Sequence, residues 1–252
     1  MQLKKCLSAL LLLSLLIASC KSDDDDATPA ESCPLSSVLL ELDPTTSLGL
    51  FDIAYNSSGR ITEAGLQTYE FTYDANGNVT SALLPSDGGF TPRVENVFTY
   101  NGDKIASVSQ NWGEAPNVDE RYVFTPSYDN DGYITTVLRT GLGGDQTLTY
   151  SFDSNGNALT WTVPIFQEVH QYTFGTGKGI VTGLTHNQAF AYGLALGQPF
   201  FHFNNSVTSE SIDDNGTIES ATFSDNTFSS NGFQATASDP NGKTYIFQYE
   251  CD

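Results

Sequence analysis

The sequence predicts an all-β fold: an antiparallel β-meander of hairpin repeats that forms a curved, partly closed sheet. Three observations predict it. A turn motif recurs along most of the chain, and aromatic and polar residues alternate before most of these turns. In addition, 12% of the 252 residues are aromatic while only 16% are charged. This composition is typical of an ordered extracellular β-protein rather than of a disordered chain.

The turn motif consists of an aromatic residue, Asp or Asn, two variable residues, Gly, one further residue and often an apolar one. Asp or Asn at the first turn position accepts hydrogen bonds from backbone N–H groups that follow it. Gly at the fourth position adopts the positive φ that closes a type I turn with a bulge. The copies, the last three of them looser, are Tyr55–Ile61, Tyr73–Val79, the shortened Tyr100–Ile105, Tyr128–Ile134, Phe152–Ala158, Ile212–Ile218, Phe228–Gly232 and Asp239–Gly242.

We expect a strand before and after each turn. Tyr69, Phe71 and Tyr73, for example, alternate with polar residues and so share one face of a strand. Apolar residues such as Ile61 follow the turns and begin the next strand. The spacing of the turn glycines fits two strands per unit, which predicts roughly twelve to sixteen strands.

Two segments interrupt this pattern. Residues Asn187–Leu196 are rich in Ala and Leu and predict a short helix, which would cover one end or the inside of a curved sheet. The glycine-rich run Gly175–Gly179 falls between predicted strands. We therefore interpret it as a turn and not as a phosphate-binding loop.

The N-terminal residues predict export and lipid attachment. Lys4 and Lys5 precede an apolar stretch, Leu7–Ile17, that is too short for a comfortable membrane-spanning helix. Ile17-Ala18-Ser19-Cys20 follows and resembles the lipobox of bacterial lipoproteins. The resemblance implies that residues 1–19 are a signal peptide and that Cys20 becomes the acylated N-terminus. An ordinary secretory signal with a coincidental cysteine is the alternative.

Four consecutive aspartates, Asp23 to Asp26, follow the lipid-bearing cysteine. Adjacent carboxylates repel one another, so we expect residues 20–32 to be a solvated tether. A basic residue followed by an acidic run also resembles the surface-export signal of Bacteroidota-type lipoproteins. That resemblance implies a place on the outer face of the outer membrane, whereas a plain spacer would leave the protein facing the periplasm.

The charge balance excludes some classes of partner. The chain has 10 Lys and Arg against 30 Asp and Glu, for a net charge of −20. Nucleic-acid binding requires basic residues that neutralise phosphates, so no nucleic-acid partner is expected. We also expect no cofactor. The expected partners are the outer-membrane lipid, through the acyl anchor, and a glycan or a protein.

Cys33 and Cys251 lie near the two ends of the predicted domain, residues 33–252. In the oxidising cell envelope they are candidates for a disulfide, which would stabilise the domain by about 5 kcal/mol in the chain-entropy model. Two free thiols are the alternative. Neither cysteine has a second cysteine or a histidine at zinc-ligand spacing.

The recurrent Tyr-Asp-Ala-Asn-Gly-Asn-Val pattern at Tyr73–Val79 and its relatives resembles the tyrosine–aspartate repeats of RHS proteins. Short lipid-anchored chains with degenerate copies resemble a Bacteroidota lipoprotein domain with a porin-like, curved antiparallel sheet. The resemblance covers roughly residues 50–250 and implies a fold without implying an activity. RHS proteins proper encase a toxin with many more repeats, and this chain has few repeats and no toxin domain.

The sequence contains no recognisable catalytic motif, and we predict neither catalytic residues nor a metal site. Two acidic turns, at Asp129–Gly132 and Asp213–Gly216, lack acidic residues where a calcium loop needs them. His170, His186 and His202 are evenly spaced, and isolated polar sites are the simpler interpretation of them. Trp112, beside Gly113 in a predicted loop, is the candidate for stacking on a ligand.

Three functional hypotheses follow. The favoured one is a non-enzymatic, lipid-anchored envelope protein with a binding or structural role, with a glycan as the candidate ligand. The second is a secreted glycan-active hydrolase with a pair of carboxylates that no motif identifies. The third is an accessory subunit of an outer-membrane complex, recognised by an unpaired sheet edge or a large apolar patch.

Overall fold

The computed structural model describes residues 35–43, 46–65, 67–86, 88, 92–114, 116–163, 168–179, 184–196, 205–214, 217–222, 224–228, 233–238 and 244–249. All of them belong to one compact unit, Cys33–Glu250. Within these residues, no helix is long and apolar enough to cross a membrane. The predicted signal peptide, Cys20, the tether, Cys33 and Cys251 lie outside the described residues.

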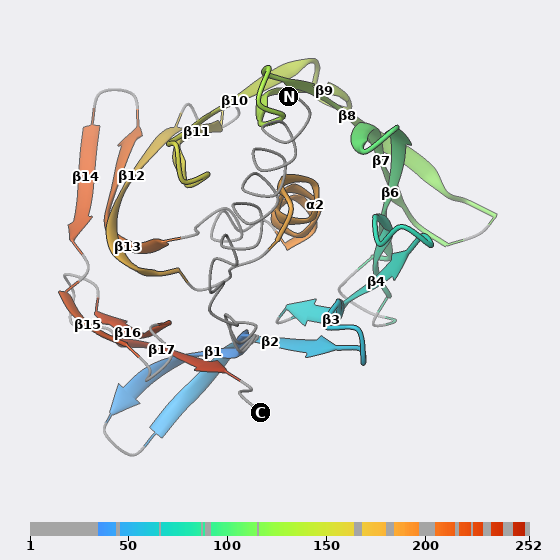
Figure 1. The fold of residues 1–252 in the computed structure, drawn as a ribbon. Coiled ribbons are helices and arrows are strands. Elements are labelled where there is room, and N and C mark those ends of the chain that lie inside the picture. Colours follow the sequence, from blue (N-terminus) through green and yellow to red (C-terminus); the bar gives the residue numbers. More distant parts are fainter. Residues whose placement is uncertain are drawn as a thin grey trace, which may run out of the picture. The chain divides into compact units, whose positions relative to one another are not determined.

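The predicted antiparallel meander is confirmed (Figure 1). The strands are β1 (Leu35–Asp43), β2 (Thr46–Tyr55), β3 (Ile61–Gly65), β4 (Tyr69–Tyr73), β5 (Val79–Leu84), β6 (Val94–Asn101), β7 (Lys104–Trp112), β8 (Asp119–Tyr128), β9 (Ile134–Gly141), β10 (Gln146–Phe152), β11 (Ala158–Val163), β12 (Glu168–Lys178), β13 (Asn205–Asp214), β14 (Thr217–Thr222), β15 (Ser224–Phe228), β16 (Gln234–Ser238) and β17 (Thr244–Tyr249).

Each strand from β1 to β13 pairs with the next one along the chain. Strands β15, β16 and β17 pair in the same way, and β17 pairs with β1. The first strand, β1, therefore lies between β2 and β17 in one sheet.

The hairpin turns form as the motif predicts. The Oδ1 atoms of Asn56, Asp74, Asp129 and Asp153 each accept hydrogen bonds from the backbone N–H groups two and four residues on. The glycine of each turn has a φ between 72° and 90°. The strand register shifts at the aromatic residue that opens each turn, which is the predicted bulge.

The tyrosines of the motif link successive repeats. Each tyrosine hydroxyl donates a hydrogen bond to a backbone carbonyl at the start of an earlier strand, one hairpin back along the sheet. The four bonds run from Tyr55 to Leu35, from Tyr73 to Ile61, from Tyr100 to Val79 and from Tyr128 to Ile105. We call this series the tyrosine ladder. It gives each of these backbone carbonyls a hydrogen-bond donor from a side chain.

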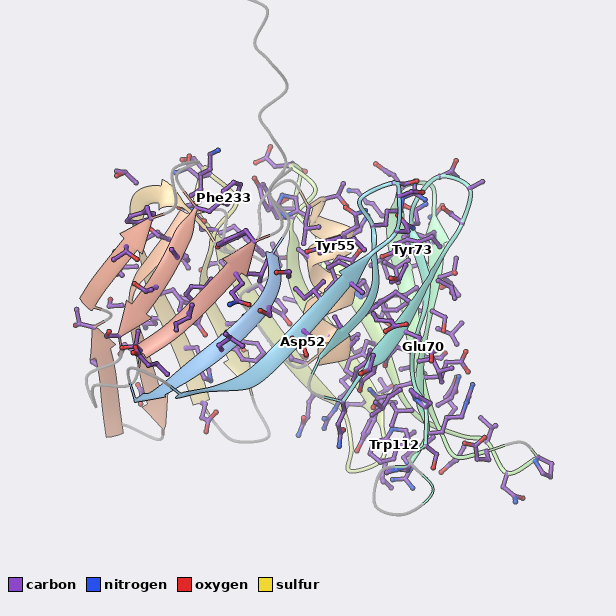
Figure 2. The ribbon with its side chains drawn as sticks, turned by 90° about the horizontal axis from the view of Figure 1, so that it is seen from below. Asp52, Tyr55, Glu70, Tyr73, Trp112 and Phe233 are labelled. Atoms are coloured by element: carbon purple, nitrogen blue, oxygen red, sulfur yellow. The ribbon has the colours of Figure 1, made fainter. Side chains whose placement is uncertain are left out.

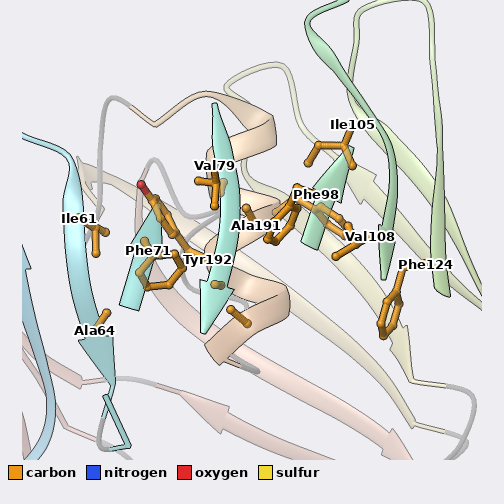
Figure 3. Packing of buried hydrophobic residues seen from close by; sticks show 14 of the residues in the cluster. Ile61, Ala64, Phe71, Val79, Phe98, Ile105, Val108, Phe124, Ala191 and Tyr192 are labelled. Carbon is orange, nitrogen blue, oxygen red and sulfur yellow. The ribbon is translucent and has the colours of Figure 1, made fainter. Parts of the chain in front are cut away.

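The predicted helix is present as α2 (His186–Leu196), on the inside of the sheet (Figure 1). Ala191 and Tyr192 are buried in the main hydrophobic core, which also contains Phe71, Phe98 and Val108 (Figure 3). The Tyr192 hydroxyl lies 2.6 Å from the hydroxyl of Tyr73, so the helix is joined directly to the tyrosine ladder. We call the sheet face that α2 contacts the inner face.

The sequence suggested that the glycine-rich run Gly175–Gly179 is a turn, and this prediction is wrong. The residues of the run up to Lys178 belong to β12. A Cβ atom at Gly177 would lie 2.2 Å from the ring of Phe228, and one at Gly175 would lie 3.0 Å from Ser206 Oγ. These glycines therefore allow other segments to approach the strand closely, which is a recognised use of glycine within a strand.

Candidate functional site

The inner face changes character beyond the helix. Phe98, Val108, Phe124 and Val137 belong to the core around α2. Because side chains two residues apart share a face of a strand, the inner face continues with polar and aromatic side chains further along β6 to β9. These are Asn96, Gln110, Trp112, Tyr122 and Arg139, and Arg121 joins them. We call these six residues the arginine–aromatic cluster.

The cluster lies at the end of the strands opposite the turns. Figure 2 shows Trp112 at the far end of the sheet from Tyr55 and Tyr73. Trp112 is the last residue of β7 and pairs in register with Val94 of β6. The backbone N–H of Gly113 donates to the carbonyl of Arg93, 3.0 Å away, so pairing with β6 extends past Trp112. The prediction of a loop at Trp112 is therefore wrong.

Three neutral side chains of the cluster form a directional hydrogen-bond chain. Trp112 Nε1 donates to Gln110 Oε1 at 3.2 Å, and Gln110 Nε2 donates to Asn96 Oδ1 at 3.0 Å. Asn96 has no exposed surface, and its Nδ2 has no hydrogen-bond partner among the described residues. A buried donor left unpaired is costly, so this amide is suited to an acceptor supplied by a buried water molecule.

The two arginines of the cluster lie over its two aromatic rings. The guanidinium carbon of Arg121 is 4.5 Å from the centre of the Trp112 ring, and that of Arg139 is 4.7 Å from the centre of the Tyr122 ring. The Nε atoms of both arginines are buried without a hydrogen-bond partner among the described residues. Trp112 is therefore covered on one side by a cation and is half-buried, rather than being a bare platform.

A bulge places Arg121 over the tryptophan. Gln110 pairs with Tyr122 and Asn111 pairs with Glu120, so Arg121 is an extra residue in β8. Gly141, opposite Tyr122, supports this bulge, because a Cβ atom there would lie 2.1 Å from the carbonyl oxygen of Arg121. The backbone N–H of Leu142 donates to the same oxygen at 3.0 Å. Bulges commonly redirect a side chain in this way.

A second aromatic group continues the inner face on β10 to β12. Tyr150 pairs with Trp161, and Trp161 pairs with His170, whose ring centre is 5.0 Å from that of the tryptophan. His170 Nε2 lies 3.3 Å from a carboxylate oxygen of Glu168. Burial raises the pKa of Tyr150 above its ordinary value. The phenol of Tyr150 therefore stays neutral at physiological pH.

The two described histidines belong to different parts of the fold. His170 belongs to the aromatic group on β12, whereas His186 begins α2 and packs against Tyr133 at 3.9 Å between ring centres. Burial lowers the pKa of His186, so its imidazole is neutral at physiological pH. His202 lies outside the described residues. Within the described ranges, no group of three or more His, Cys, Asp or Glu side chains is arranged to hold a metal ion.

Sequence reasoning found Trp112 and missed the two arginines that accompany it. One signal in the sequence could have pointed to the arginines. The chain has only 10 Lys and Arg residues, so each of them is a candidate for a specific contact. Five of the six cations in the described residues lie over aromatic rings, namely Arg60, Lys104, Arg121, Arg139 and Lys178. The sixth, Arg93, contacts Glu95 at 2.7 Å.

Chemically, the cluster offers donors and aromatic surface. Its six side chains include no carboxylate, imidazole or thiol. Two guanidinium groups, two amides, an indole N–H and a phenol can hold a polar ligand through hydrogen bonds. Among these six side chains, no nucleophile lies against a general base.

Neither family models nor curated proteins match this sequence. Solved structures do. A porin-like protein from Bacteroides uniformis has 14% identity and a TM-score of 0.52, over 86% of this chain and 97% of that chain. The likeness shows the fold. It confirms the porin-like curved sheet that the sequence resemblance implied.

Two further structures are more distant. A porin-like protein from Bacteroides vulgatus has 9% identity and a TM-score of 0.41, over 87% of this chain and 99% of that chain. The Tc holotoxin pore of Photorhabdus luminescens has 10% identity and a TM-score of 0.21, over 80% of this chain and 9% of that chain.

Proposed function

We propose that this chain is a lipid-anchored protein of the bacterial cell envelope that binds a carbohydrate ligand, without catalysis, at the arginine–aromatic cluster. The observation that carries the proposal is the combination, on partly exposed side chains, of two aromatic rings that each lie under a guanidinium group: Arg121 lies over Trp112, and Arg139 lies over Tyr122. These side chains and the neighbouring Gln110 amide supply hydrogen-bond donors beside aromatic surface.

Carbohydrate fits these side chains for two reasons. Sugar hydroxyls both donate and accept hydrogen bonds, so they complement the amide of Gln110, which carries donor and acceptor atoms. The half-buried rings of Trp112 and Tyr122 add amphipathic surface, which small-molecule sites combine with a few placed polar groups.

The proposed place in the envelope is supported by the sequence. Lys4 and Lys5, the apolar stretch and the residues before Cys20 resemble a lipoprotein signal, and stable anchoring requires two or more acyl chains. Metabolic labelling with a fatty acid tests this part. The full chain should incorporate the label and a Cys20→Ala variant should not; equal labelling of both would contradict lipid attachment at this residue.

The ligand-binding part is tested by applying the purified full chain to a glycan array. We expect binding that a Trp112→Ala variant loses. Leu138→Ala is the matched control, because Leu138 neighbours Arg139 in β9 and is 40% exposed on the opposite face. Retained binding by Trp112→Ala, or an array on which no glycan binds, would contradict the proposal.

A further inference from the structure

The cluster holds an unusual concentration of positive charge for this chain. The protein carries three times as many acidic as basic residues, 30 against 10. Two of its cations nevertheless lie in one cluster, each fixed by a ring instead of by a carboxylate. Arg139 has no ion pair with any described residue, and Asp119 reaches Arg121 only at 3.7 Å with its own side chain 73% exposed.

Stacking on the rings orients the two guanidinium groups for binding a planar anion. A guanidinium lying on a ring keeps its plane fixed and offers the N–H groups on its edge. That planar fork matches a carboxylate, which can accept two parallel hydrogen bonds. Because Tyr122 and Trp112 hold the two groups in place, little side-chain freedom is lost when an anion binds.

We infer that the arginine–aromatic cluster binds a carboxylate-bearing saccharide, such as a uronic-acid oligosaccharide. The guanidinium groups of Arg139 and Arg121 receive the carboxylate. The Gln110 amide receives a hydroxyl group of the same or the next sugar ring. This inference rests on the proposed function and specifies the class of ligand at the same site.

The observations favour an acidic saccharide over an acidic peptide. Beside the two arginines the cluster offers neutral hydrogen-bonding groups and rings, and the carboxylate of Asp119 lies 3.7 Å from Arg121, so this surface suits hydroxyls rather than further carboxylates. A peptide with a carboxylate on every residue would also be repelled by a chain of net charge −20, whereas a saccharide can present one carboxylate between neutral rings.

The test is a calorimetric titration of the full chain with tri-galacturonate and with the same trisaccharide after reduction of its carboxyl groups to alcohols. We expect the reduced ligand to bind about tenfold or more weakly, since hydrogen bonds to charged groups are the stronger kind. Arg139→Gln should remove this difference. Leu138→Gln, on the opposite face of the same strand, should preserve it. Arg121→Gln, at a side chain that is 38% exposed, is the second variant if Arg139→Gln does not fold.

Each outcome has a distinct meaning. If the carboxyl-reduced trisaccharide binds as tightly as the acidic one, carboxylate recognition is wrong while carbohydrate binding stands. If an oligoglutamate peptide binds more tightly than tri-galacturonate, the ligand class is wrong. If neither saccharide binds and no glycan of any kind on the array binds, the inference and the proposed function both fail. If only neutral glycans bind, the inference fails and the proposed function stands.

Discussion

At the scale of single residues, the tyrosine ladder makes the clearest energetic prediction. Tyr100 donates to the Val79 carbonyl at 2.9 Å. Tyr100→Phe removes this hydrogen bond and should lower the free energy of unfolding by about 0.5–1.5 kcal/mol in a urea titration. Tyr133→Phe is the control, because the Tyr133 hydroxyl has no hydrogen bond to any described residue; it should change stability by less than about 0.5 kcal/mol. Equal effects would contradict a role for the ladder bond.

The same tyrosines predict a loss of stability at alkaline pH. Burial raises the pKa of Tyr128 to about 12 from its ordinary value of 10.0, and raises that of Tyr100 further. The unfolded chain loses phenolic protons from about pH 10 while the folded chain retains them, so the stabilising contribution is complete below pH 10 and is lost as the pH rises toward 12. Chemical unfolding at a series of pH values, with tyrosinate absorbance as the second readout, checks this. Constant stability through that window would contradict buried, neutral tyrosines.

At the scale of secondary-structure elements, the pairing of β3 with β4 contains a repulsion. Glu63 and Glu70 are direct register partners, and both side chains are exposed. Like charges in this position destabilise a strand pair, so Glu70→Lys should raise the free energy of unfolding by about 0.2–1 kcal/mol, and less at high salt.

Glu95→Lys is the control, for which the opposite change in stability is expected. Glu95 accepts from Arg93 at 2.7 Å and from Ser81 at 3.2 Å, so a lysine there should lower stability. A thermal melt of the two variants beside the parent protein would separate these effects. Stabilisation by both substitutions would indicate that only the net charge matters.

Sequence reasoning predicted the elements that are determined by residues close together in the sequence. The turn from Tyr73 to Val79 is determined by Asp74, which caps the following N–H groups, and by Gly77, which has a φ of 89°. Hydrogen bonds, chiefly from the Asn78 side chain, lower the pKa of Asp74 below its ordinary value. The Ala- and Leu-rich composition likewise identified α2, with a boundary one residue from the observed one.

The arginine–aromatic cluster depends on contacts between residues in different strands, which is why sequence reasoning found only Trp112. The position of Arg121 depends on a bulge and on the absence of a side chain at Gly141, in a different strand. Contact between Arg139 and Tyr122 depends on the register of β8 with β9. Gly113 suggested a loop beside Trp112, whereas strand pairing continues to that point.

At the scale of the whole molecule, the inner face has two parts that carry different kinds of side chain. Near the turns, α2 fills the inner face with buried side chains such as Phe190 and Tyr192. Toward the other end of the strands, the inner face carries stacked cations and a chain of hydrogen-bonded amides. The first part supplies a rigid support, and the second is the part that we propose to bind ligand.

The central claim is that ligand binds on the inner face at the arginine–aromatic cluster. Hydroxyl-radical footprinting of the full chain, with and without tri-galacturonate, tests it most directly, since aromatic side chains report their own accessibility. The account predicts protection of Trp112 and Tyr122 in the presence of the trisaccharide, while Tyr133, near the turns, is unchanged. Protection elsewhere in the chain with Trp112 and Tyr122 unaffected would contradict the account.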